Sequence, residues 1–93
     1  MTRAMDDIAW QSYAYELGVN LARARQARGL SQARVAEAAG IALHTYRKFE
    51  KGESRPGTPL NPRLTTLMAL SQVLGVPLVE LLPPEVPDTS AGS

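Results

Sequence analysis

The feature that most constrains this chain is a series of four glycines, Gly29, Gly40, Gly52 and Gly75. Each follows a short stretch in which apolar residues recur three and four positions apart, as they do on one face of a helix. Glycine just beyond a helix end readily takes the left-handed conformation that closes the helix. The spacing therefore predicts an all-α fold of short helices joined by tight turns.

Five helices are expected from this punctuation. The first runs from about Tyr13 to Arg28, or from as early as Asp7, where an aspartate can cap it. Its apolar stripe comprises Trp10, Ala14, Leu17, Leu21 and Ala24. The remaining helices are expected at Gln32–Ala39, at Leu43–Lys51, from Asn61 to Leu74, and from Pro77 to Leu82.

Local signals predict where these helices begin. Ser31 is the expected N-cap of the second helix, because its hydroxyl can accept a bond from an unpaired backbone amide. Asn61 as a cap and Pro62 in the first turn favour a start of the fourth helix at that point. The buried stripe of the fourth helix is expected to comprise Leu64, Leu67, Leu70 and Leu74. Residues 53–60 are expected to form a loop.

Composition bounds the class of protein. A chain of 93 residues has room for one domain. It has no cysteine and one histidine, so we expect no disulfide, no metal site and no cofactor. It shows neither a membrane-spanning run nor a signal peptide, and we expect a cytoplasmic protein. No nucleophile–base arrangement is visible, because His44 lacks a carboxylate at helical spacing on its own face, and we do not expect an enzyme.

Charge is distributed unevenly along the chain. From Arg23 to Arg55 there are eight basic residues and three acidic ones, a net charge of +5, whereas the remainder carries −4. A basic centre between acidic ends suits a face that binds a polyanion. An ordinary solvated surface fits equally well, so charge alone does not decide between them.

The helix expected at Leu43–Lys51 has two different faces. At about 100° per residue, Thr45, Tyr46 and Phe49 fall on one side of it. The other side carries Leu43, His44, Arg47, Lys48 and Lys51. The major groove of DNA admits one helix, and long basic side chains can reach base edges and phosphates there. Any amphipathic surface helix has a similar pattern, so the face is suggestive only in context.

That context is a set of linked motifs in a fixed order. They are Leu21-x-x-x-Arg25-x-x-Arg28-Gly29-Leu30-Ser31-Gln32-x-x-Val35-Ala36-x-x-Ala39-Gly40-Ile41, Tyr46-Arg47-Lys48-Phe49-Glu50-Lys51-Gly52, Asn61-Pro62-x-Leu64-x-Thr66-Leu67, Leu74-Gly75-Val76 and Leu81-Leu82. Together they resemble the Xre family of phage repressors, of the Cro and repressor type. The resemblance implies a compact five-helix, lambda-repressor-like domain with a helix-turn-helix at its second and third helices.

The residue pattern, together with the resemblance, predicts a division of the chain. Residues 13–82 would form the DNA-binding domain. Residues 1–12 would be an N-terminal extension, either the start of the first helix or an arm used in dimerisation. Residues 83–93 would be a disordered tail, because they hold no core residue beyond Val86.

Positions that match the family's motifs carry expected roles. Residues that would face base edges are Leu43, His44 and Lys48. Residues that would contact DNA phosphates are Ser31, Gln32, Arg47, Lys51 and Arg55. Arg25 and Glu50 match a partly buried salt bridge between the first and third helices, and we assign them a structural role. Leucine can pack against a thymine methyl group, and lysine or histidine can donate to guanine.

The chain departs from the family pattern in three places. Ala42 replaces the usual serine or threonine cap before the third helix, a loss of about 1 kcal/mol. Tyr46 and Phe49 are bulkier than the usual aliphatic residues. Eight residues separate Gly52 from Asn61, where the family uses about three, and this longer loop could keep a DNA contact through Arg55 or hold a partner.

The resemblance implies a sequence-specific transcription regulator, a repressor in our interpretation, that binds double-stranded DNA as a homodimer. Two apolar patches could form the dimer seam, one near the fifth helix (Val76, Leu78, Val79 and Leu82) and one on the first helix (Ile8, Tyr15 and Val19). Another protein could bind the 53–60 loop or the N-terminal extension. Two other functions stay open, a DNA-binding antitoxin of a toxin–antitoxin pair and a protein–protein adaptor that has lost DNA affinity.

Overall fold

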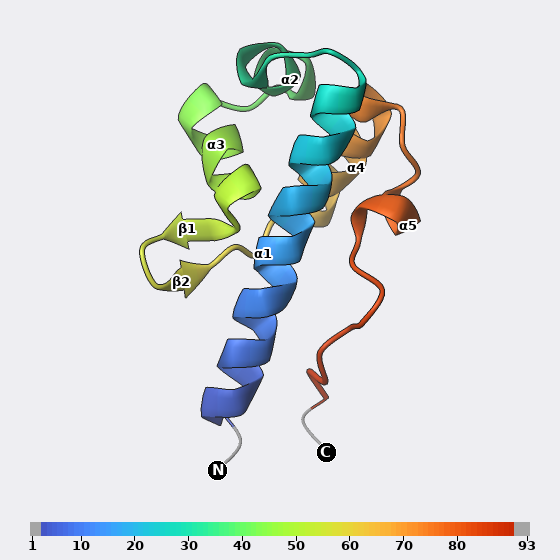
Figure 1. Cartoon of the computed structure of the whole chain (residues 1–93). Helices are drawn as coiled ribbons and strands as arrows, with labels where there is room; N and C mark the ends of the chain where they lie inside the picture. The colour runs from blue at the N-terminus through green and yellow to red at the C-terminus, as the bar shows by residue number, and fades with distance from the viewer. Residues whose placement is uncertain (1–2, 91–93) are drawn as a thin grey trace.

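The computed structural model describes residues 3–90 and contains five helices and one small hairpin. The order is α1 (Arg3–Ala27), α2 (Gln32–Ala39), α3 (Leu43–Lys51), β1 (Glu53–Arg55), β2 (Thr58–Pro59), α4 (Leu64–Leu74) and α5 (Leu78–Leu81). In Figure 1, the long helix α1 runs through the middle, with α3 and the hairpin on one side and α5 on the other. The expected five-helix fold is confirmed, and the bounds of α2 and α3 agree with those predicted.

Helix α1 begins before both of the starts expected from sequence, Tyr13 and Asp7. It starts at Arg3, and the first glycine in the chain is Gly18, so neither glycine nor proline interrupts its first four turns. The indole Nε1 of Trp10 donates to the Leu60 carbonyl at 3.0 Å and ties this extra length to the domain. Most of the segment set apart as an extension therefore continues the helix. Residues 1 and 2 lie outside the described range, and a role as a dimer arm stays a prediction.

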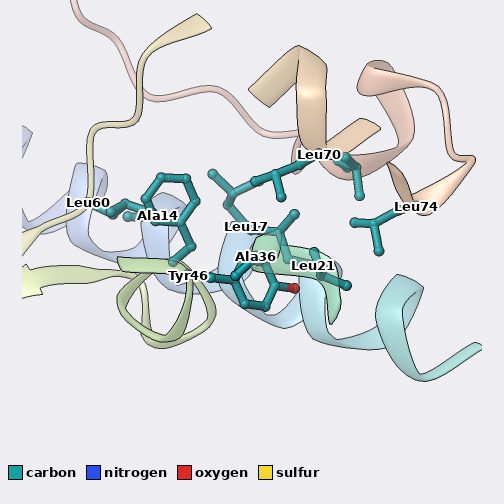
Figure 2. Close-up of a cluster of buried hydrophobic side chains, with 11 residues drawn as sticks. Ala14, Leu17, Leu21, Ala36, Tyr46, Leu60, Leu70 and Leu74 are labelled. Carbon is teal, nitrogen blue, oxygen red and sulfur yellow. The ribbon is translucent and has the colours of Figure 1, made fainter. Parts of the chain in front are cut away.

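The core gathers side chains from all five helices and from the base of the hairpin. Its members are Ala14, Leu17, Leu21, Val35, Ala36, Tyr46, Phe49, Leu60, Leu70, Leu74 and Leu81. Figure 2 shows several of these meeting between α1, α3 and α4. Tyr46, Leu21, Leu70 and Leu74 are completely buried. Because α1 and α3 both contribute to this cluster, packing fixes the orientation of α3 relative to the rest of the domain.

Two glycines allow α1 and α3 to approach closely. A Cβ atom at Gly18 would lie 2.5 Å from the Glu50 carbonyl oxygen, and one at Gly52 would lie 2.7 Å from the Ala14 carbonyl oxygen. Neither position has space for a methyl group. Gly18 costs helix stability in the middle of α1, and the close contact with α3 is the physical reason for its presence.

The expected loop at 53–60 is wrong in one respect, because the chain forms a hairpin there. Strands β1 and β2 pair antiparallel, with Arg55 opposite Thr58. Pro56 and Gly57 connect them, and Gly57 has φ +81°, as the third position of a type II turn requires. The Leu60 amide donates to the Gly52 carbonyl at 2.8 Å and closes the base of the hairpin.

The start predicted for the fourth helix is also wrong. Arg63, with extended backbone and no side-chain cap, is the N-cap, and α4 begins at Leu64. Asn61 precedes a proline, which disfavours helical backbone at that residue, and no helix forms before Leu64. Leu64 is 64% exposed and does not join the buried stripe, since about 120° of helix rotation separates it from Leu70.

After α5 the described chain has no further helix or strand, and it runs back beside the first half of α1 (Figure 1). A surface cavity lies between this segment and α1, and its lining residues are Ala9, Ser12, Tyr13, Glu16, Glu85, Val86 and Pro87. Residues 91–93 lie outside the described range, and disorder of the 83–93 tail stays a prediction. Among the described residues, no helix combines the length and apolar character needed to cross a membrane.

Candidate nucleic-acid interface

Helices α2 and α3 are joined by a turn whose ends are fixed locally. The Ser31 hydroxyl accepts a bond from the Arg34 amide at 3.1 Å and caps α2 as predicted. Gly40 ends α2 with φ +75°, and the Ile41 amide donates to the Ala36 carbonyl at 3.0 Å. Ala42, the N-cap of α3, makes no side-chain cap bond. The two helices therefore meet through a tight turn, the helix-turn-helix arrangement.

Helix α3 buries one face and exposes the other. Tyr46 and Phe49 are buried in the core, as predicted from the helical spacing. The opposite face consists of half-buried Leu43 and exposed His44, Arg47, Lys48 and Lys51. Within residues 3–90, the three cations of this face form no ion pair, so their charge is not neutralised by a neighbouring carboxylate. We call this set the outer face of α3.

A hydrogen-bonded network centred on Glu50 joins the three helices. Arg25 of α1 donates to the Glu50 carboxylate at 2.6 and 3.1 Å and also to the Leu30 carbonyl at 3.0 Å. The Gln32 Nε2 atom at the start of α2 donates to Glu50 Oε1 at 2.9 Å. The Tyr46 hydroxyl donates to Glu50 Oε2 at 2.5 Å. The orientation of α3 is thus tied to both α1 and α2 by polar contacts as well as by the core.

The network shifts the ionisation of its members. Burial by itself would raise the pKa of Glu50, but the bonds donated by Arg25, Tyr46 and Gln32 outweigh it, and the pKa is lowered. Burial raises the pKa of Tyr46, and its bond to the Glu50 carboxylate raises it further. The bond to Glu50 raises the pKa of Arg25. The carboxylate is therefore charged and the phenol neutral at neutral pH, the states that these bonds require.

The structure brings several predicted site residues together. Arg25 and Glu50, expected as a salt bridge, are bonded to each other, and Gln32 is bonded to the same carboxylate. A carboxamide nitrogen carries two protons, so this contact leaves one proton of Gln32 for another acceptor. Ser31 and Gln32 stand at the N-terminus of α2, where backbone amides and the helix dipole favour an anion.

Arg55 lies farther along, at the end of the hairpin. It is exposed and occupies the first position of the Pro56–Gly57 turn, four residues beyond Lys51. Figure 1 shows that the hairpin projects from the C-terminal end of α3. An exposed basic residue therefore lies in the hairpin that follows the C-terminal end of α3.

Sequence reasoning missed the role of the Tyr46 hydroxyl, because it treated Tyr46 only as a bulky core residue. The signal was present, since Tyr46 and Glu50 are four residues apart on one helix and so lie one turn from each other. Among the described residues, no group of three or more histidine, aspartate or glutamate side chains is placed to hold a metal ion.

Comparison with known proteins bears on this geometry. Residues 16–82 match the model of the helix-turn-helix domain family. Over 68 residues the chain is 37% identical to an uncharacterized HTH-type transcriptional regulator, y4dJ, of Sinorhizobium fredii (strain NBRC 101917 / NGR234), covering 73% of this chain and 80% of that protein. The fold is similar to that of the restriction-modification controller protein C.AhdI from Aeromonas hydrophila, with a TM-score of 0.64 and 26% identity, covering 74% of this chain and 96% of the other. The chain belongs to the helix-turn-helix domain family.

Proposed function

We propose that this protein is a transcription regulator that binds specific double-stranded DNA sequences. In this proposal it acts as a repressor, of the type that includes Cro and the phage repressors. The observation that carries the proposal is the outer face of α3, where exposed cations that form no ion pair within residues 3–90 stand opposite the buried side chains of Tyr46 and Phe49. A helix held this way can enter the major groove as a rigid unit. The similarity to a transcriptional regulator and to a controller protein supports the same function.

The first group of residues in this proposal reads base edges. Leu43, His44 and Lys48 lie toward the outer side of α3, and two of them belong to its first turn. Lys48 would donate to the O6 or N7 atoms of guanine, and His44 could use the same acceptors. Leu43, half-buried at the first position of the helix, would pack against a thymine methyl group.

The second group contacts the DNA backbone. Ser31 and Gln32 would present the N-terminus of α2 to a phosphate. Arg47 and Lys51 of α3, together with Arg55 of the hairpin, would contact phosphates on either side of the groove. We assign Arg25 and Glu50 no DNA contact, because their charged groups are bonded to each other and their side chains are only 15% and 9% exposed.

We propose that the protein binds DNA as a homodimer, because a two-fold dimer places two copies of α3 on successive turns of the duplex. Of the four apolar residues expected to form a seam near α5, Val79 is 76% exposed, whereas Val76, Leu78 and Leu82 pack partly against the core, so a seam there would rest on Val79. Exposed Ile8 and Tyr15 on α1 offer a second candidate seam. Sedimentation of the wild type, Val79→Lys and Tyr15→Lys distinguishes the two seams, because only the substitution within the true seam should dissociate the dimer. A monomeric wild type, with or without DNA, refutes the dimer.

The function is tested by selection from a pool of randomised double-stranded DNA at low salt. The proposal predicts enrichment of one motif, in two half-sites about 10 base pairs apart if the dimer forms. The double variant Arg47→Gln with Lys51→Gln removes two positive charges. It should recover the same motif with lower affinity, because it keeps the base-reading residues. If the wild type enriches no motif, the regulator function is refuted.

A further inference from the structure

Glu50 uses all the hydrogen-bonding capacity of its carboxylate. A carboxylate offers about four acceptor positions, two on each oxygen. Oε1 accepts from Arg25 Nη2 at 3.1 Å and from Gln32 Nε2 at 2.9 Å. Oε2 accepts from Arg25 Nε at 2.6 Å and from the Tyr46 hydroxyl at 2.5 Å. Each oxygen is therefore held by two donors, and any rotation of the carboxylate breaks bonds on both sides.

Tyr46 supplies one of these four bonds from inside the core. Its side chain is completely buried, and the Glu50 side chain is only 9% exposed. A buried acceptor that loses its donor retains the cost of desolvation, so the carboxylate would shift to find another partner. In doing so it would move Oε1, the atom that holds Gln32. The hydroxyl is thus connected to the start of α2 through a single carboxylate.

We propose that the Tyr46 hydroxyl is a positioning group for DNA binding, which acts by holding Glu50 so that Gln32 presents its carboxamide to the DNA backbone. The inference rests on the proposed function, in which Gln32 is a phosphate contact. Tyr46 itself touches no DNA, because it has no exposed surface. Its effect on affinity passes through Gln32, and this route separates a positioning role from a merely structural one.

The first test is a double-mutant cycle on DNA affinity with Tyr46→Phe, Gln32→Ala and the double variant. Fluorescence anisotropy is read with the selected duplex, at a temperature where circular dichroism shows every variant fully folded. Tyr46→Phe should lower affinity roughly 3- to 10-fold, the net effect of losing one ordinary hydrogen bond. In the Gln32→Ala background the same change should have almost no further effect. Wild-type affinity for Tyr46→Phe, or an equal loss in both backgrounds, would overturn the proposal.

Tyr13→Phe is the matched control. Tyr13 is the other buried tyrosine, packed on Trp10 at a ring-centroid distance of 5.4 Å, and it takes no part in the Glu50 network. Removal of its hydroxyl should leave DNA affinity unchanged. An affinity loss for Tyr13→Phe as large as that for Tyr46→Phe would mean that buried hydroxyls affect binding generally, and the specific link to Gln32 would be refuted.

The second test needs no DNA. In an NMR spectrum of the labelled protein, the two side-chain amide protons of Gln32 should be separated in chemical shift by more than those of an unbonded glutamine, because one is bonded to Glu50 and the other is not. Tyr46→Phe should bring the two signals closer together, whereas Tyr13→Phe should not. Unchanged Gln32 signals in Tyr46→Phe would overturn the positioning link. Changed signals in a protein that binds no DNA would preserve that link and refute the proposed function instead.

Discussion

Replacing Gly18 by alanine perturbs the place where α1 and α3 are closest. The new Cβ would lie 2.5 Å from the Glu50 carbonyl oxygen and 2.7 Å from the Phe49 carbonyl oxygen. Ordinary contacts of this kind begin at 3.4 Å, so the two backbones must separate by about 0.9 Å. Both obstructing atoms belong to the backbone, which cannot rotate away as a flexible side chain can.

Two opposing effects set the size of the change. Alanine in a helix interior is about 1 kcal/mol more favourable than glycine. Overpacking a core typically costs about 1–3 kcal/mol, and here the neighbours are rigid, so the upper part of that range applies. We expect a net loss of about 1–2 kcal/mol, or a melting temperature lower by about 5–15 °C. Since α3 must move, affinity for DNA should fall as well.

Thermal unfolding followed by circular dichroism measures the change. The pair Arg23→Ala and Arg23→Gly, on the exposed face of the same helix, measures the helix propensity difference without the steric contact. Correction for that difference isolates the overpacking cost. If Gly18→Ala is as stable as wild type, or more stable by the propensity difference, α1 and α3 are not packed as closely as described and the reasoning fails.

Three further predictions concern charge, capping and DNA contacts. Glu50→Gln should make the free energy of unfolding depend less on pH in acid. The lowered pKa of Glu50 stabilises the folded wild type above pH 4.5, the ordinary value, and this stability is lost as pH falls through the folded pKa. The free energies of unfolding of the two proteins, measured by urea titration, should therefore converge in acid. Ala42→Ser should stabilise the protein by about 1 kcal/mol, because Ala42 is exposed, has extended backbone and makes no cap bond, and an unchanged melting temperature would contradict this. Lys48→Ala should reduce the preference for one base over the others at a single base pair by about 1–3 kcal/mol. Lys51→Ala should instead lower the affinity for all DNA sequences alike and reduce the slope of log affinity against log salt concentration by about 1. Identical effects of the two substitutions across a panel of duplexes would contradict their separate assignments.

Features set by a few neighbouring residues could be predicted from the sequence. Helix α2 begins after Ser31 and ends before Gly40 because a serine cap and a left-handed glycine are local devices. The inner and outer faces of α3 follow from helical periodicity and the burial of Tyr46 and Phe49. These decisions need no knowledge of the rest of the fold.

Features that depend on distant contacts or competing local signals were not predictable in the same way. Helix α1 extends to Arg3, and its added length is tied to the domain by the bond from Trp10 to the Leu60 carbonyl, 50 residues away in sequence. The fourth helix starts at Leu64 because the preference of a residue before proline for non-helical backbone prevails over the cap signal of Asn61, and Arg63 is extended. The Pro56–Gly57 turn, in contrast, carried a type II signature that could have revealed the hairpin.

The Glu50 network lies between these cases. The bond from Tyr46 joins residues one helical turn apart, and the helical spacing alone could have suggested it. The bonds from Arg25 and Gln32 require that three helices meet, so their geometry appears only in the folded chain. DNA contact residues can be assigned by their position on α3, but the DNA base sequence that they read cannot be deduced from that position.

The central claim is that the outer face of α3 reads DNA, and amide mapping by NMR tests it most directly. Labelled protein is titrated with the selected duplex and, separately, with a scrambled duplex of equal length. The account predicts that the selected duplex shifts the amides of residues 43–51 and 31–34 most strongly, and that the scrambled duplex shifts residues 43–48 much less. Unchanged amide signals in α3 with the selected duplex, or equal shifts with both duplexes, would contradict it.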